Sequence, residues 1–301
     1  MGDGILVLNK KAGMTSHDAV NRVRRLYSTK QVGHTGTLDP MAEGVLCILV
    51  GRTVKASEYA VFGRKIYRAG LKLGITTDTE DVWGEVITKH EGKMPTEAQV
   101  REAIGGFIGN ILQVPPMYSA LKVGGKKLVD LARSGVTVER ESREITVYNI
   151  NVEKVNEEQG EYLLDVECSK GTYIRTLCAD IGAALGVGGA MSSLLRAANS
   201  GFGLENAVTL EDIEKMEPSE REALLLPCER LFESLTRIDL PPFFERLARC
   251  GAEIYQKKIG TDVPDGELVR LYGGGKFFAV ARATEFEEGS ALKPEKQFDL
   301  T

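Results

Sequence analysis

The stretch Gly33-His34-Thr35-Gly36-Thr37-Leu38-Asp39-Pro40-Met41-Ala42-Glu43-Gly44 is the most informative part of this chain. It contains three glycines, one proline and one aspartate, and its apolar residues follow neither a helical nor a strand period. Such a composition predicts a shaped loop. The loop presents a single carboxylate, Asp39, between glycine turns, with His34 five residues upstream. The first question is therefore what this carboxylate does.

The loop by itself leaves several interpretations of Asp39 open. A phosphate-binding loop is disfavoured because the frame G-x-x-x-x-G-K-[ST] is absent. An aspartyl nucleophile for phosphoryl transfer normally follows an apolar strand, whereas polar residues precede Asp39. Asp39 and Glu43 form the carboxylate pair of a glycosidase in a third interpretation. In the fourth, Asp39 only caps the next helix, which is the commoner use of an Asp-Pro pair.

Regular elements are predicted on both sides of the loop. The apolar runs 5–8 and 45–50 indicate buried strands. Ser16 is predicted as the N-cap of a helix, with Asp18 in the first turn, where a carboxylate favours the helix dipole. The arginines of this helix, Arg22 and Arg25, fall off its apolar face and are predicted to be free to reach a ligand.

A strand, a turn and a helix follow one another over residues 162–185. Apolar residues alternate over 162–168, a polar turn covers 169–172, and apolar residues then recur at helical spacing. Tyr173 and Arg175 stand at the start of this helix, where unpaired backbone amides favour anions. Residues 67–73 alternate in the same way and predict another strand with one polar face.

The order of elements favours an α+β fold. Strands and helices do not alternate strictly, and glycine turns at 124–125 and 273–275 indicate hairpins. We therefore expect a mixed, largely antiparallel sheet flanked by helices. From about Pro218 the sequence becomes rich in Glu, Arg and Leu. We place a boundary that separates a domain of residues 1–238 from a small β-rich domain of residues 239–301.

Composition restricts the class of protein. The chain has 301 residues, of which 43% are apolar and 27% charged, as in ordinary globular proteins. No apolar run approaches the roughly 18 residues that a membrane span needs, and no signal peptide is predicted. The five cysteines are scattered and there are three histidines, so we expect no metal site and reduced thiols in a cytoplasm.

Charge is distributed unevenly along the chain. Residues 1–72 carry a net charge of +7, whereas the whole chain carries −5, so the remainder carries −12. A basic lobe beside an acidic remainder suits a polyanion bound at one face, although chance clustering of solvated lysines explains the numbers equally well.

Three separate segments place aromatic or apolar residues beside cations. They are Tyr67-Arg68, Lys170–Arg175 and Leu194–Arg196. Aromatic rings stack on bases, and a guanidinium can hold a carboxylate with two hydrogen bonds and favour its ionised form. Together with Asp39, these residues predict a site that acts on a nucleobase.

With these segments in view, the chain resembles the TruB family of bacterial tRNA pseudouridine synthases over most of residues 4–210. The resemblance is carried by five ordered motifs: Lys10-x-x-Gly13-Met14-Thr15-Ser16, Gly33–Pro40, Tyr67-Arg68 to Asp78-Thr79-x-Asp81, Pro115–Lys122 and Cys168–Arg175. Departures occur at Lys11, Val129 and residues 195–198, where many members have other residues. They concern RNA contacts and not the reaction.

The resemblance implies a role for each candidate residue. Asp39 matches the catalytic aspartate, Tyr67 the tyrosine that stacks on the target uracil, and Arg175 the arginine that pairs with the aspartate. The residues His34, Tyr173 and Leu194 match positions that line the pocket or contact the substrate.

The same resemblance implies isomerisation of the uridine at position 55 in the T loop of tRNA. It implies no cofactor, and a PUA-like RNA-binding domain at the C-terminus. We also expect a monomer, because one active site and a small tail domain require no protein partner. A non-catalytic RNA-binding protein and a base-excising glycosidase remain as alternatives. Whether Asp39 attacks the ribose or the base stays open.

Overall fold

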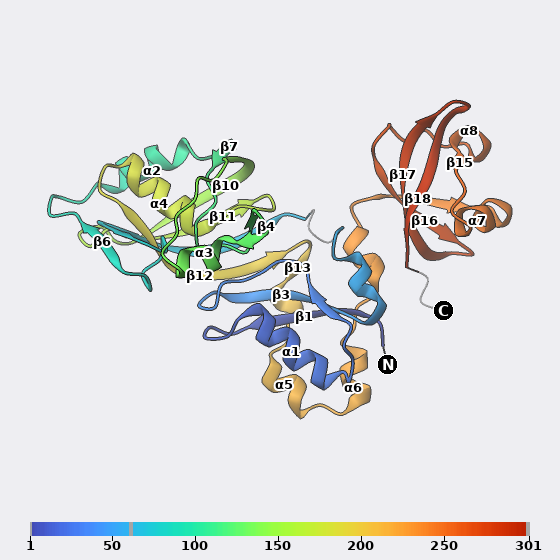
Figure 1. Cartoon of the computed structure of the whole chain (residues 1–301), viewed down its shortest axis with the longest axis horizontal. Helices are drawn as coiled ribbons and strands as arrows, with labels where there is room; N and C mark the ends of the chain where they lie inside the picture. Colours follow the sequence, from blue (N-terminus) through green and yellow to red (C-terminus); the bar gives the residue numbers. More distant parts are fainter. Residues whose placement is uncertain (1, 60–62, 299–301) are drawn as a thin grey trace.

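The computed structural model describes residues 2–59 and 63–298 of the chain, and in this part the chain builds two principal β-sheets (Figure 1). A nine-stranded sheet occupies the N-terminal part, and a five-stranded sheet forms a separate body at the C-terminal end. The predicted α+β architecture with a sheet-rich C-terminal part is confirmed.

The large sheet has the strand order β1-β3-β12-β4-β11-β10-β7, with β2 added beside β3 and β13 beside β12. Its pairs are antiparallel except that of β3 with β12, so the prediction of a mixed, largely antiparallel sheet is correct. The strands are β1 (Gly4–Lys10), β2 (Val32–His34), β3 (Glu43–Val50), β4 (Lys65–Leu73), β7 (Gly109–Gln113), β10 (Arg143–Asn156), β11 (Glu161–Cys168), β12 (Gly189–Asn199) and β13 (Phe202–Gly203).

Helices and two small hairpins surround this sheet (Figure 1). The helices are α1 (Ser16–Leu26), α2 (Glu97–Gly105), α3 (Leu128–Arg133), α4 (Ile174–Ala184), α5 (Leu210–Lys215) and α6 (Pro218–Ala223), with 3₁₀ turns η1 (Gly51–Ala56), η2 (Leu204–Asn206) and η3 (Cys228–Phe232). The hairpins pair β5 (Ile75–Thr77) with β6 (Val86–Lys89), and β8 (Lys122–Val123) with β9 (Lys126–Lys127). The predicted turn at residues 124–125 is confirmed.

The C-terminal body is built on the sheet β14-β16-β17-β18-β15. Its elements are β14 (Thr236–Leu240), α7 (Pro242–Arg249), β15 (Ile254–Tyr255), α8 (Gln256–Ile259), β16 (Leu268–Gly273), β17 (Lys276–Phe286) and β18 (Gly289–Gln297). Glycines 273–275 connect β16 to β17, as predicted. Residue 238, where the sequence analysis divides the chain, lies inside β14.

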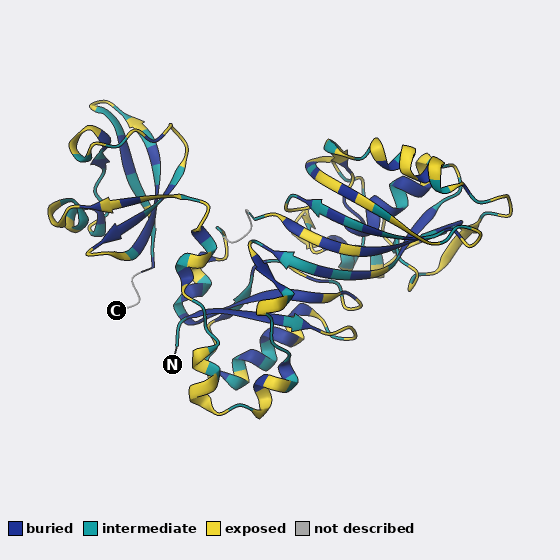
Figure 2. Cartoon of the chain, turned by 180° about the vertical axis from the view of Figure 1, so that it is seen from behind, coloured by how far each residue is buried: buried dark blue, intermediate teal, exposed yellow. Residues whose placement is uncertain are grey.

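Alternation along the strands explains where the main core lies. In β4, Tyr67, Ala69 and Leu71 are buried, whereas Ile66 and Arg68, on either side of Tyr67, are exposed. Apolar faces of α1 and α4 pack on the sheet (Figure 2). The opposite face of α1 is partly exposed, whereas most of α4 is buried. Burial of this kind stabilises a fold by about 25 cal/mol for each Å² of apolar surface.

The start of α1 differs from the prediction. Thr15, and not Ser16, is the N-cap: its hydroxyl accepts a hydrogen bond from the Asp18 amide, and the Asp18 carboxylate accepts one from the Thr15 amide. Both residues favour capping, and the capping box with Asp18 decides for Thr15 because Asp18 is three residues after it. Ser16 therefore has another role, described below.

Candidate active site

Asp39 lies in the loop between β2 and β3, and the first helix fixes the backbone just before it. The Ser16 hydroxyl accepts a hydrogen bond from the Leu38 amide at 2.8 Å and donates one to the Leu38 carbonyl at 3.0 Å. Ser16 and Leu38 are both buried, with exposed fractions of 3% each. Since unpaired backbone groups are costly inside a protein, this double contact fixes Leu38 and therefore the direction in which Asp39 leaves the loop.

A buried lysine fixes the loop just after Asp39. Lys10 is 1% exposed, and its Nζ donates to the carbonyl oxygens of Lys11, Met14 and Pro40 at 2.9–3.1 Å. The Pro40 carbonyl also accepts from the Gly13 amide at 2.9 Å. Burial is the largest influence on the pKa of Lys10 and lowers it to about 8. The motif at residues 10–16 thus holds the loop from one side.

Arg196 holds the loop from the other side. This arginine of β12 is fully buried, and it donates to the carbonyl oxygens of Val45, Thr37 and Gly36 at 2.7, 3.3 and 3.1 Å. The backbone of β12 also approaches Gly44 so closely that a Cβ there would lie 2.3 Å from the Arg196 carbonyl oxygen. Gly44 has φ +100°, so glycine is required for both reasons.

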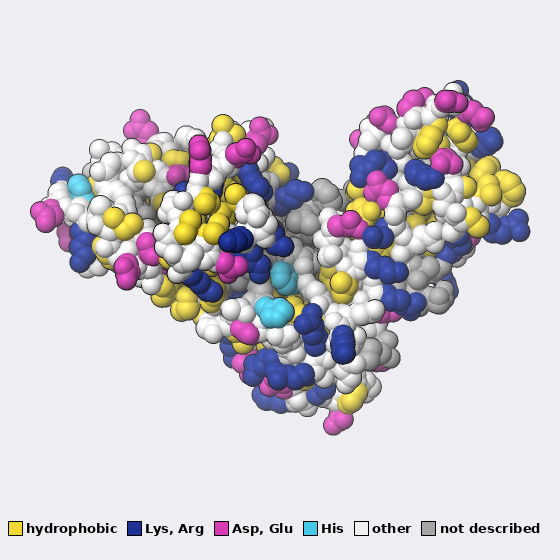
Figure 3. Space-filling model, in the orientation of Figure 1, with side chains coloured by type: hydrophobic (Ala, Val, Ile, Leu, Met, Phe, Trp, Pro, Cys, Tyr) yellow, Lys and Arg dark blue, Asp and Glu magenta, His cyan; other side chains and the backbone are white. Residues whose placement is uncertain are grey.

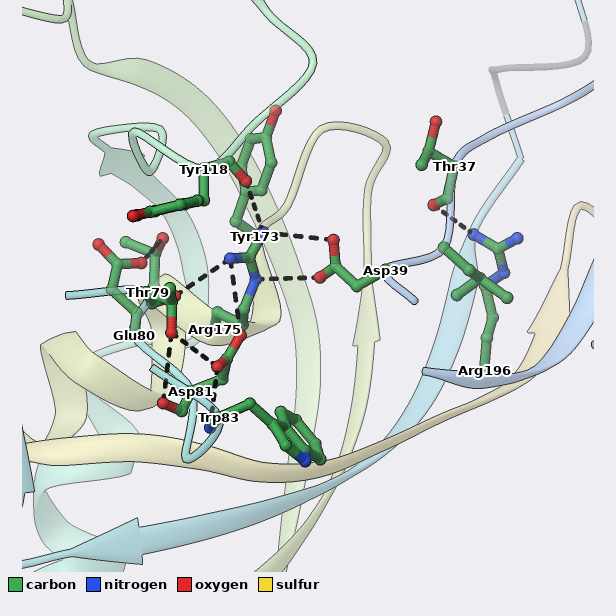
Figure 4. Close-up of polar contacts among 12 residues, drawn as sticks. Thr37, Asp39, Thr79, Glu80, Asp81, Trp83, Tyr118, Tyr173, Arg175 and Arg196 are labelled. Atoms are coloured by element: carbon green, nitrogen blue, oxygen red, sulfur yellow. Dashed lines mark hydrogen bonds and ion pairs between the residues drawn. The ribbon is translucent and has the colours of Figure 1, made fainter. Parts of the chain in front are cut away.

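Arg175 meets Asp39 with two nitrogens (Figure 4). Its Nε lies 2.9 Å from Asp39 Oδ2, and its second terminal nitrogen lies 3.3 Å from Oδ1. The guanidinium also donates to the carbonyl oxygens of Thr79 and Tyr118, at 3.1 and 2.8 Å, and it lies 3.7 Å from Asp81 Oδ2. Such a two-pronged contact fixes the plane of the carboxylate as well as its position.

Helix α4 presents Arg175 because its N-cap, Tyr173, is held in place. The Tyr173 amide donates to the side chain of Gln113 at 2.8 Å, and Gln113 donates back to the Tyr173 carbonyl at 3.1 Å. Gln113 is 2% exposed. The helix start is thereby fixed to strand β7, and Arg175 enters the site as the second residue of the helix.

Electrostatics at Asp39 reflect two opposing influences. Burial raises the pKa of the Asp39 carboxyl, and the Arg175 guanidinium opposes this rise. The net direction is upward, so Arg175 favours the ionised carboxylate without bringing its pKa below the ordinary value. Burial also raises the pKa of Tyr67, which therefore keeps its phenolic proton.

Most of the predicted residues surround one cavity of about 390 Å³. Asp39, Tyr67, Tyr173, Arg175 and Leu194 all line it, although they come from four distant segments of the chain. Tyr67 is only 6% exposed, and the cavity volume lies within the range of small-ligand pockets. A carboxylate at the wall of a cavity with tyrosine rings can act on a flat, uncharged group such as a nucleobase.

His34 does not line this cavity. It ends β2, and its Nδ1 accepts a hydrogen bond from the Gly36 amide at 3.2 Å. Burial and the nearby Arg196 and His17 lower the pKa of His34, which favours the neutral ring. With Nδ1 accepting, the neutral ring carries its proton on Nε2.

The sequence analysis missed two further cations at the cavity, Lys65 and Lys127. Lys65 lines the cavity beside Tyr67, since the two residues project from the same face of β4. Burial lowers the pKa of Lys65 to about 8, and Arg196 adds to this effect. The alternation that predicted the inward position of Tyr67 also applies to Lys65, two residues earlier, and could have identified it.

Cations gather around the hollow of the molecule and over the lobe that carries α1 (Figure 3). Within α1, Arg25 is exposed, whereas Arg22 Nε lies 3.6 Å from Glu214. Arg22 is therefore engaged by an acidic neighbour, in contrast to the prediction that it is free. In the described ranges, no group of three or more His, Cys, Asp or Glu side chains is placed to hold a metal ion, and no helix is long and apolar enough to cross a membrane.

Comparison with known proteins adds an independent observation. Residues 24–174 match the family described as TruB family pseudouridylate synthase (N terminal domain), and residues 175–233 match the tRNA pseudouridylate synthase B C-terminal domain. A protein of Alkaliphilus oremlandii (strain OhILAs), tRNA pseudouridine synthase B, is 44% identical over 90% of this chain and 89% of its own length.

Two further matches agree with this one. The tRNA pseudouridine synthase B of Clostridium tetani (strain Massachusetts / E88) is 40% identical over 94% of this chain and 96% of its own length. Among solved structures, that titled "Crystal Structure of a Cbf5-Nop10-Gar1 Complex" matches with a TM-score of 0.75 and 26% identity, over 98% of this chain and 84% of the other.

Proposed function

The chain belongs to the TruB family of pseudouridylate synthases and is a tRNA-modifying isomerase of uridine to pseudouridine, and from this premise we propose that its target is the uridine at position 55 in the T loop. We assign Asp39 as the catalytic carboxylate. The observation that carries this assignment is the contact of both Asp39 oxygens with Arg175 at the wall of a cavity that Tyr67 also lines.

The isomerisation is balanced within the substrate. The bond between C1′ of the ribose and N1 of uracil breaks, the base turns, and a bond between C1′ and C5 forms. C5 loses its proton and N1 gains one, so no other reactant is consumed. Asp39 acts either at the ribose or at C6 of the base, and both routes require its ionised form. Arg175 favours that form and orients it.

The remaining residues hold the base in the cavity. In this proposal the ring of Tyr67 stacks on the uracil, and Tyr173 and Leu194 form further walls. The target uridine must leave its stack, at a cost of a few kcal/mol that is smaller in a loop than in a duplex. His34, close to the cavity but outside its wall, would support the displaced conformation of the RNA.

We also propose how the rest of the chain takes part. Exposed basic residues among the first 72 positions, such as Arg25, contact phosphates of the T stem-loop. The residues before β14 form the catalytic domain, and the body that begins with β14, two residues before the predicted boundary at 238, forms a PUA-like domain that contributes RNA contacts. The protein acts as a monomer in the cytoplasm and requires no cofactor.

One substrate tests the reaction. A tRNA transcript labelled in its uridines is incubated with the wild-type enzyme, and both pseudouridine and free uracil are quantified. We expect pseudouridine without free uracil. Released uracil would indicate a base-excising glycosidase, and binding without either product would indicate an RNA-binding protein.

A substitution tests the role of Asp39. Asp39→Asn keeps the size of the side chain and removes the charge, so it should bind the transcript and form no pseudouridine. Measurable turnover in a preparation free of wild-type enzyme would refute Asp39 as the catalytic carboxylate. Glu43→Gln, which changes the nearby carboxylate at the start of β3, is the matched control and should retain turnover.

A further inference from the structure

Trp83 is an exposed aromatic residue close to the proposed catalytic carboxylate. It is the single tryptophan of the chain, and 46% of its surface is exposed. It lies in the connection between β5 and β6, next to Asp81 (Figure 4). None of the roles proposed above uses this residue.

Hydrogen bonds hold the backbone at Trp83 in place. The Trp83 amide donates to Asp81 Oδ1 at 3.2 Å, and the neighbouring Val82 amide donates to the Met191 carbonyl at 3.0 Å. Asp81 in turn lies 3.7 Å from Arg175, the residue that holds Asp39. Trp83 is therefore held at a defined position relative to the catalytic pair.

A second cavity, of about 270 Å³, connects Trp83 to Asp39. Its wall includes Met41, Trp83, Arg133 and Met191, together with Asp39 and Arg175. The same Asp39 and Arg175 also line the cavity that holds Tyr67. The two cavities are therefore neighbours, since Tyr118 and Val129 as well as the catalytic pair line both of them.

The chemistry of the second cavity suits a nucleobase. Trp83 supplies a flat ring, and the exposed Met41 supplies polarisable apolar surface. The exposed Arg133 supplies a positive charge in the wall that also contains Asp39 and Asp81. Stacking on an aromatic side chain is tolerant of base identity because every base has a π-face. An RNA strand with one base beside Tyr67 has its neighbouring nucleotides within reach of a cavity that shares Asp39.

We propose that the second cavity binds the base of a nucleotide adjacent to the target uridine, and that this base stacks on Trp83. The proposal rests on the function proposed above, because it takes the target uridine to occupy the cavity of Tyr67. It gives the enzyme two displaced bases to hold, one in each cavity. Occupancy of the second cavity keeps the strand in the register that brings uridine to Asp39.

The single tryptophan makes this contact directly measurable. Asp39→Asn protein, which cannot turn over, is titrated with a T stem-loop hairpin while tryptophan fluorescence is recorded. Hairpins with an abasic nucleotide immediately 5′ or 3′ of the target uridine are compared with the intact one. We expect binding to quench the fluorescence, and we expect one of the two abasic hairpins to abolish most of the quenching. Quenching that is absent, or that both abasic hairpins retain, would overturn the proposal.

Kinetics of variants give a second readout. Trp83→Ala should raise KM for the hairpin about 10-fold and leave kcat nearly unchanged, because stacking contributes to binding on that scale. Trp83→Phe keeps a ring and should restore most of the affinity. Ile87→Ala, at a 66% exposed position of the same hairpin that does not line the cavity, should behave as wild type. Equal KM values for Trp83→Ala and wild type would refute the proposal.

The function proposed above can fail separately. If wild-type protein forms no pseudouridine in the intact hairpin, the reaction is wrong whatever the fluorescence shows. If it forms pseudouridine and neither abasic substitution changes the quenching, the reaction stands and the second binding site is wrong.

Discussion

The Ser16 hydroxyl forms two hydrogen bonds with the backbone of Leu38, one as acceptor at 2.8 Å and one as donor at 3.0 Å. Ser16→Ala leaves both backbone groups of Leu38 without this partner in a buried place, which should cost about 1–3 kcal/mol of stability. Because Asp39 follows directly, kcat should also fall, roughly 10- to 100-fold. Denaturant unfolding and single-turnover rates measure the two effects.

Thr15→Ala is the matched control for Ser16→Ala. Thr15 caps the same helix without contacting the Asp39 loop, so its removal should cost about 1 kcal/mol of stability and leave kcat unchanged. If both variants lost rate in proportion to their lost stability, Ser16 would serve only the helix.

Arg175→Lys should lower kcat by about 100-fold with little change in KM. A lysine keeps the positive charge, but its single ammonium cannot contact both oxygens of Asp39 and also reach the carbonyl oxygens of Thr79 and Tyr118. Single-turnover kinetics with saturating enzyme isolate this step. A rate within twofold of wild type would show that the second contact of the guanidinium is dispensable.

The rate should fall as the pH is lowered, with a midpoint above the ordinary carboxyl pKa of about 3.9. Burial raises the pKa of Asp39, and only the ionised carboxylate acts, so activity is present above this pKa and lost below it. Arg175 lowers the pKa of Asp39, and Arg175→Gln should therefore shift the midpoint of its residual rate to higher pH. In Arg175→Lys, which keeps the charge, the shift should be smaller. Coincident midpoints in all three proteins would contradict this account.

The logarithm of the binding constant for tRNA should decrease linearly with the logarithm of the salt concentration. Each phosphate that a cation neutralises adds a slope of about −0.7 to −0.9. Arg25→Gln on the exposed side of α1 should reduce the slope by about one, and Arg25→Lys should not change it. Filter binding over a series of salt concentrations tests this, and an affinity that is independent of salt would refute phosphate contacts by the basic lobe.

The part of the site that could be predicted lies in local patterns. The glycine turns around Asp39 indicated a shaped loop, and alternation in β4 indicated which residues share a face with Tyr67. The position of Arg175 followed from the start of a helix after a strand and a turn. These signals depend on neighbours in sequence, so they can be recognised without any knowledge of the fold. The specific roles came from the resemblance of ordered motifs.

Arg196 could not be predicted in the same way. A charged residue after two leucines is consistent with a substrate contact or a solvent-exposed position, yet it is fully buried. Its partners are carbonyl oxygens of Gly36, Thr37 and Val45, more than 150 positions earlier in the chain. Only the parallel pairing of β12 with β3 brings Arg196 to these carbonyl oxygens, and no local periodicity in the sequence predicts that pairing.

The contact of Arg196 with the Asp39 loop has a consequence for synthesis of the protein. The loop is translated early, but the strand that donates two hydrogen bonds to it and one to the adjoining β3 is translated only some 160 residues later. Pairings so distant in sequence form late and slow the folding of a domain. A nascent chain that ends after α4 already contains Asp39, Tyr67 and Arg175, yet the loop that carries Asp39 still lacks the partner that shapes it. We therefore expect the enzyme to stay inactive on the ribosome until β12 has emerged.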